Sequence, residues 1–133
     1  MGCDIHWVLE TKTDRNWLGL MSSDSTNFIA GNRWYSFFTE LGLPHRGESD
    51  TAVTLAGFPV DPSELSLYEF SIWSGEAHSP SYLSLDSYVA AYNRALSRHY
   101  PSEKLITARK LFGDWFWTAE DGNGYRVVFW FDN

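Results

Sequence analysis

The chain has 133 residues, the size of one domain, so we expect a single domain over residues 1–133. Its composition, 44% hydrophobic and 20% charged with seven Trp, is that of a globular protein with an aromatic-rich core or site. The net charge of −7 argues against direct nucleic-acid binding and favours a basic partner surface.

The single cysteine, Cys3, excludes an intramolecular disulfide and fits a reducing compartment. No stretch approaches the apolar length that a membrane span requires, and no basic segment precedes an apolar one as in a signal peptide. We therefore expect a soluble, cytoplasmic protein without membrane contact.

The N-terminal third predicts a β-hairpin and a short helix. Residues 5–13 and 17–21 have strand character and are joined by a turn at residues 14–16. Residues 22–32 are polar and Gly-containing, which indicates a loop. Residues 34–41 then predict a short helix that ends at Gly42 and Pro44, with its aromatic side chains in the core.

The middle segment, residues 44–80, holds four of the five prolines and little sustained periodicity beyond residues 65–73, so we expect it to be mostly loop. Long irregular segments inside compact domains often carry function.

Helical spacing returns from residue 84 to residue 100, with Ser84 or Asp86 as the N-cap. A second helix is predicted from Ser102, as its cap, to Gly113. Residues 115–119 and 125–131 then predict a hairpin whose last strand is apolar on both faces, as in a central strand.

These elements predict an α+β fold: a mainly antiparallel sheet from the N- and C-terminal hairpins, with two to three helices packed on one face.

The strongest candidate site is the pair Asp4 and His6 at the start of the first strand. Because side chains alternate along a strand, these two share one face, whereas Ile5 and Trp7 share the other. Such a pair can bind one metal ion, or the Asp can fix the tautomer and orientation of a working His. The sequence leaves both interpretations open.

A second polar cluster, Glu76 to Ser81, precedes the helix at residue 84. If it folds over the first strand, Asp4, His6 and His78 form a metal-ligand set suited to zinc, manganese or iron. Asp61 or Glu76 is then the fourth ligand or the general base.

Three further side chains are candidate ligand-binding groups. Ser79 and Ser81 follow His78, and two alternatives stay open for this segment: a serine nucleophile activated by His78, or a cap for the coming helix formed by His78 and Ser79. Asp132 lies on a strand end that can reach the same pocket. The competing interpretation of the whole cluster is structural, since hydrogen-bonded His and Asp residues are common on strands.

Four segments carry a resemblance to a known family: MGCDIH at residues 1–6, GFPVDPS at 57–63, HSPSYLSL at 78–85 and RVVFWFDN at 126–133. Together they resemble a family of small uncharacterised proteins encoded by bacteriophages and prophages. The polar positions that recur in that family match Asp4, His6, Asp61, His78, Ser79, Ser81 and Asp132. Pro80 stands where many relatives have a second His, which removes one candidate ligand.

The resemblance implies a phage accessory protein that acts in the bacterial cytoplasm. Three functions are compatible with this resemblance and with the candidate residues. The first is a metal- or ligand-binding protein, hydrolase-like toward a nucleotide or phosphate compound. The second is a non-enzymatic anti-defence protein that binds a host defence complex or a signalling nucleotide. The third is a structural protein in which the polar cluster joins the terminal strands.

Overall fold

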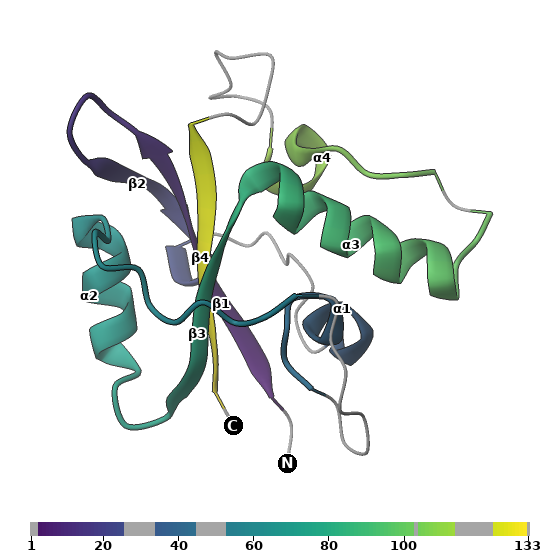
Figure 1. Cartoon of the computed structure of the whole chain (residues 1–133), viewed down its shortest axis with the longest axis horizontal. Helices are drawn as coiled ribbons and strands as arrows, with labels where there is room; N and C mark the ends of the chain where they lie inside the picture. The colour runs from purple at the N-terminus through teal and green to yellow at the C-terminus, as the bar shows by residue number, and fades with distance from the viewer. Residues whose placement is uncertain (1–2, 26–33, 45–52, 103, 114–123, 133) are drawn as a thin grey trace.

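A four-stranded antiparallel sheet forms the centre of the described molecule (Figure 1). The computed structural model describes residues 3–25, 34–44, 53–102, 104–113 and 124–132. The strands are β1 (Asp4–Lys12), β2 (Trp17–Ser22), β3 (Ala77–Ser84) and β4 (Tyr125–Asp132), in the order β2-β1-β4-β3. The start of β1 lies beside the end of β4, where Asp4 pairs with Asp132.

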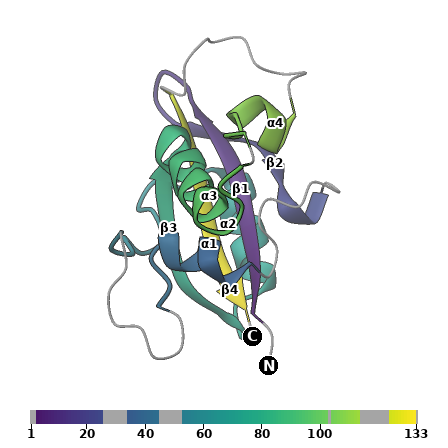
Figure 2. The ribbon, with the colours of Figure 1, turned by 90° about the vertical axis from the view of Figure 1, so that its right-hand side faces the viewer.

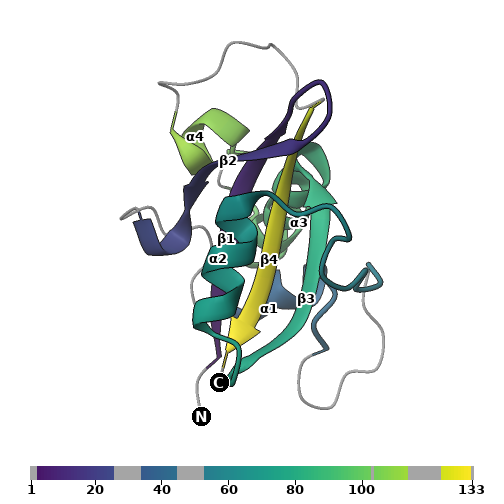
Figure 3. The same ribbon diagram turned by 90° about the vertical axis from the view of Figure 1, so that its left-hand side faces the viewer.

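The helices cover both faces of this sheet (Figures 2 and 3). They are the 3-10 turn η1 (Ser23–Ser25) and helices α1 (Tyr35–Glu40), α2 (Glu64–Ile72), α3 (Leu85–His99) and α4 (Ala108–Phe112). Helices α1, α3 and α4 pack on one face, which we call the helix-rich face, and α2 packs on the other, the α2 face. The predicted α+β fold with an antiparallel sheet is confirmed, with α2 added on the second face.

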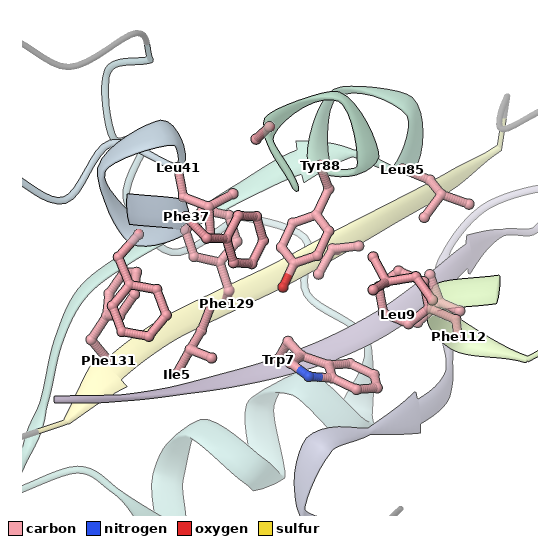
Figure 4. Close-up of a cluster of buried hydrophobic side chains, with 14 of the residues drawn as sticks. Ile5, Trp7, Leu9, Phe37, Leu41, Leu85, Tyr88, Phe112, Phe129 and Phe131 are labelled. Carbon is pink, nitrogen blue, oxygen red and sulfur yellow. The ribbon is translucent and has the colours of Figure 1, made fainter. Parts of the chain in front are cut away.

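The main core lies on the helix-rich face (Figure 4). Strand alternation sends Ile5, Trp7 and Leu9 of β1 to this face. Edge-to-face ring pairs join strands to helices, with centroids 5.0 Å apart for both Trp7 with Phe112 and Phe38 with Phe131. Strand β4 is buried along its whole length, as predicted for a central strand.

Two predicted helices are confirmed by their boundaries. The Ser84 side chain caps α3 by accepting from the backbone N–H of Ser87 at 3.2 Å. Helix α1 ends before Gly42, whose φ of 112° is a conformation that L side chains rarely adopt.

Other sequence predictions need correction. Residues 77–84 were expected to contain the end of a loop but form β3, which pairs with β4. The helix predicted from Ser102 is the shorter α4, because Thr107 rather than Ser102 supplies the cap, and it ends at Gly113 as expected. The predicted strand at residues 115–119 lies outside the described residues.

Helix α2 lies inside the segment predicted to be loop, and it begins after the N-cap Ser63. None of the helices in the described part of the chain is both long and apolar enough to cross a membrane.

Candidate functional site

His6 is enclosed by aromatic and acidic groups on the α2 face. Its Nε2 is hydrogen-bonded to Asp132 Oδ2, and its Nδ1 lies 3.3 Å from Asp24 Oδ1. The centroids of the Trp73 and Trp130 rings lie 4.1 and 6.2 Å from that of its imidazole. A carboxylate can only accept, so a hydrogen bond to either of them needs an N–H on the imidazole. In this geometry neither ring nitrogen is free to bind a substrate.

Asp24 connects this cluster to the end of α2. Its Oδ2 accepts a hydrogen bond from Trp73 Nε1 at 3.0 Å, one residue beyond the helix. Glu69, on the inner side of α2, accepts from Ser22 Oγ at 3.2 Å. Burial raises the pKa of the Glu69 carboxyl, and the neighbouring Asp24 raises it further by charge repulsion and a hydrogen bond. We call His6, Asp24, Glu69 and Asp132 the His6 cluster.

A second polar network holds the start of α2. Glu10 of β1 is fully buried and lies opposite Arg126 of β4, whose Nε donates to Glu10 Oε1 at 2.5 Å. Glu10 Oε2 accepts from the Ser63 N–H at 2.8 Å and from Ser66 Oγ at 2.6 Å. These bonds satisfy the buried charge on both sides, as a buried ion pair requires. We call this set the Glu10 network.

Asp61 completes the Glu10 network at its exposed edge. Arg126 Nη1 donates to Asp61 Oδ1 at 3.1 Å, and this hydrogen bond holds the pKa of the Asp61 carboxyl below its ordinary value. The Arg126 guanidinium also stacks on the Trp17 ring, 4.1 Å from its centroid.

Apolar residues lie on both sides of α2. Its inward side mixes polar residues, of which Ser66 is fully buried and Glu69 is 8% exposed, with the partly buried Leu65 and Phe70. Its outward side carries Leu67, Tyr68 and Ile72, which are 57%, 64% and 55% exposed. Large apolar side chains on the outward side are unusual for a surface helix, which ordinarily directs its polar residues there. We call Glu64, Leu67, Tyr68, Ser71 and Ile72 the outer face of α2.

Gly19 permits the close approach of α2 to the sheet. A Cβ at this position would lie 2.8 Å from Leu65 Cδ2 and closer still to Leu65 Cβ. Leu65 packs with Phe58 and Phe70 against a small apolar cluster of Val8, Val128 and Trp130. The position of α2 on the sheet therefore depends on the missing side chain of Gly19 in β2 as well as on the helix's hydrogen bonds.

The structure brings together three of the residues that the sequence singled out. Asp4, His6 and Asp132 lie on the α2 face at one end of the sheet. His78 instead pairs with Phe131 and stacks on its ring, 6.2 Å away, on the helix-rich face. The predicted ligand set of Asp4, His6 and His78 therefore does not converge.

The other predicted residues are spread over the molecule. Asp61 contacts Arg126, six residues along β4 from Asp132 and thus roughly 20 Å away. Glu76 is exposed in the turn before β3. Within the described residues, no group of three or more His, Cys, Asp or Glu side chains is arranged to hold a metal ion.

Ser79 and Ser81 occupy an irregular part of β3. The β3–β4 register shifts between His78 and Ser81, and Ser79 at this shift has a positive φ of 55° and bonds to His78 Nδ1 at 3.0 Å. Ser81 is fully buried, and its Oγ accepts from the Ala56 N–H at 2.9 Å. Ser81 thus fastens a loop to the sheet.

Sequence reasoning missed Asp24, Glu69 and Trp73 of the His6 site, and Glu10 of the second network. One signal for Glu10 was available, because it continues the alternation of Asp4 and His6 along an otherwise apolar strand. A charged residue at a core position requires a partner, and Arg126 in the apolar last strand is the matching cation. Asp24 and Glu69 come from polar segments and carry no comparable signal.

Comparison with protein-family models, with curated proteins and with solved structures found no match to this chain.

Proposed function

We propose that this chain is a non-enzymatic accessory protein that binds a basic partner protein through the outer face of α2. The observation that carries the proposal is the exposed apolar surface on the outer face of α2. Ser66 and Glu69 bind the inner side of the helix to the sheet by buried hydrogen bonds, and three large apolar side chains on the outer side face solvent. Contiguous exposed apolar surface is typical of interaction sites.

The charge of the sequence segment that contains α2 indicates the chemistry of the partner. Between Arg46 and Arg94 the sequence contains no Lys or Arg. The same stretch contains seven carboxylates: Glu48, Asp50, Asp61, Glu64, Glu69, Glu76 and Asp86. An apolar helix face within an acidic segment is complementary to an apolar stripe bordered by Lys and Arg. In the phage setting that the resemblance implies, we propose a host defence protein in the bacterial cytoplasm as this partner.

The enclosure of His6 fits this role better than catalysis. Both ring nitrogens face carboxylates and two indoles lie beside the ring, so His6 acts as a positioning residue for α2. A general base, in contrast, needs one nitrogen within reach of the substrate proton.

The binding proposal is tested with a labelled amphipathic helical peptide that has leucines along one face and lysines along the other. Fluorescence anisotropy should show saturable binding to the wild-type chain. The double substitution Leu67→Ser and Ile72→Ser should weaken it by roughly tenfold or more, since it removes the apolar centre of the surface. Leu105→Ser, which removes an equally exposed leucine outside α2, is the matched control.

Two results would overturn the proposal. One is equal binding of a peptide with the same composition in scrambled order, which would show attraction by charge alone. The other is a dimer in sedimentation analysis that the double substitution abolishes, which would assign the outer face of α2 to a second copy of this chain.

A second candidate function is a divalent metal site, zinc, manganese or iron, beside His6. It is favoured by the register that places Asp4 opposite Asp132, the carboxylate bonded to His6. Elemental analysis of protein purified without chelator, for the wild type and for Asp4→Asn, tests it. Stoichiometric metal that the substitution removes would support this function, and equal metal content in both proteins would reject it.

A further inference from the structure

A separate candidate site lies in the segment of the chain that is richest in basic residues. Five of the ten Lys and Arg residues fall within residues 94–110, together with one acidic residue: Arg94, Arg98, Lys104, Arg109 and Lys110. This segment comprises the second half of α3, the stretch that runs back along it, and the start of α4 (Figure 1). This chain of net charge −7 thus contains one distinctly basic segment.

Two of these arginines are held side by side by one buried carboxylate. Glu40, at the end of α1, has a side chain only 5% exposed. Its Oε1 accepts from Arg94 Nε at 2.6 Å, and its Oε2 pairs with Arg98 Nη2 at 2.8 Å. Within this trio two guanidinium groups share one negative charge, so one positive charge is left over. Both arginines remain 43% to 57% exposed and keep further N–H donors for another acceptor.

These arginines border a pocket whose opposite wall is fixed. The pocket has a volume of about 710 Å³ and is lined by Ala90, Asn93, Arg94, Ser97, Arg98 and Leu105. Asn93 clamps the backbone next to Leu105: its Nδ2 donates to the Ile106 carbonyl at 2.9 Å, and its Oδ1 accepts from the Ile106 N–H at 2.8 Å. The pocket is widely open to solvent, and its lining joins charged, hydroxyl and apolar groups.

We propose that this pocket binds a small organic anion, a phosphate ester or a carboxylate that carries an apolar group. The planar forks of Arg94 and Arg98 match the oxygens of either anion, and Glu40 holds the forks in place before the ligand arrives. Leu105 and Ala90 offer the apolar contact, and the Ser97 hydroxyl is a further donor. This site shares no residue with the outer face of α2, so neither proposal depends on the other.

Calorimetric titration of the full chain with phenyl phosphate, benzoate and inorganic phosphate tests the proposal. Phenyl phosphate or benzoate should bind, and the stronger of the two identifies the preferred anion. Arg98→Gln should weaken that binding by roughly tenfold. Arg109→Gln, which removes an equal charge from α4, should leave it unchanged. Leu105→Ser should weaken binding of the aromatic anions without disturbing the contacts of Arg94 and Arg98 with Glu40.

Three outcomes would overturn the site: no binding of either aromatic anion, equal weakening by Arg98→Gln and Arg109→Gln, or inorganic phosphate binding as tightly as phenyl phosphate. The second would show general charge attraction, and the third would show that the apolar wall is not used. Arg98 and Leu105 are exposed, so their substitution should leave the fold intact, and a thermal unfolding curve for each variant checks this.

Discussion

Glu10 on β1 and Arg126 on β4 lie directly opposite each other, and their side chains meet beneath α2 with Arg126 Nε 2.5 Å from Glu10 Oε1. The other oxygen of Glu10 accepts from Ser63 and Ser66 at the first turn of the helix. One carboxylate therefore fastens both a neighbouring strand and a helix. The far end of α2 is held by different chemistry, the His6 cluster.

Replacement of Glu10 by Leu should lower the free energy of unfolding by about 3–5 kcal/mol, because it leaves the Arg126 charge buried without its main partner. Urea denaturation measures this loss. The double variant Glu10→Leu with Arg126→Met removes both charges and should be more stable than Glu10→Leu alone. A double variant less stable than the single one would mean that Arg126 contributes mainly through its packing on Trp17.

Gly19→Ala should destabilise the protein by about 1–3 kcal/mol, because the added methyl group overlaps Leu65 and must displace α2 from the sheet. Thermal and urea unfolding both report this change. Gly75→Ala is the control, since a Cβ at Gly75 meets no atom within 4 Å. Equal stability of the two variants would contradict the close seating of α2 on β2.

Strands β1, β2 and β4 and helix α3 were predictable because their apolar residues recur at the period of the element or, in β4, form a continuous run. In β1, Ile5, Trp7 and Leu9 alternate with residues that are polar except for Val8. The helical spacing of Val89, Tyr92 and Leu96 predicted α3, although its fully buried face is the neighbouring one, formed by Leu85, Tyr88, Ala91 and Ala95.

Helix α2 was not predictable in this way. Its most buried positions are Ser66 and Glu69, and its apolar residues lie on both its inner and its outer side, so they mark no single face.

The sequence predicted the placement of the candidate site residues correctly only for those that lie on the terminal strands. Alternation places Asp4 with His6, and the strand-end position of Asp132 suggested that it lies near Asp4, which the β1–β4 register shows. His78 was expected beside them because it was assigned to a loop. As part of β3, its face is fixed by pairing with Phe131, and this face is the opposite one.

His6→Ala should lower the free energy of unfolding by about 2–4 kcal/mol, since it removes the buried imidazole beside Trp73 and Trp130 and leaves the Asp132 carboxylate without its His6 hydrogen bond. Intrinsic tryptophan fluorescence should change in the folded state as well. His99→Ala, at the exposed end of α3, is the control and should have a much smaller effect. An unchanged stability for His6→Ala would contradict the positioning role.

Two carboxyls at opposite ends of α2 should give opposite pH dependences. Burial and the nearby Asp24 raise the pKa of Glu69 above its ordinary value of 4.5, so the folded state favours the protonated form. The stability that this proton contributes is present in acid and is lost as the pH rises through the folded pKa. Glu69→Gln stays neutral and should therefore gain stability over the wild type near neutral pH, with the gain vanishing in acid.

Asp61 supplies the contrast, because the hydrogen bond from Arg126 lowers its pKa below the ordinary 3.8. Its stabilising contribution is present above that value and is lost as the pH falls through the folded pKa, so Asp61→Asn should cost stability near neutral pH and not in strong acid. Urea midpoints measured across this pH range test both signs. If the difference in urea midpoint from the wild type changed with pH in the same direction for the Glu69 and Asp61 variants, net charge rather than the local partners would control the pH dependence of stability.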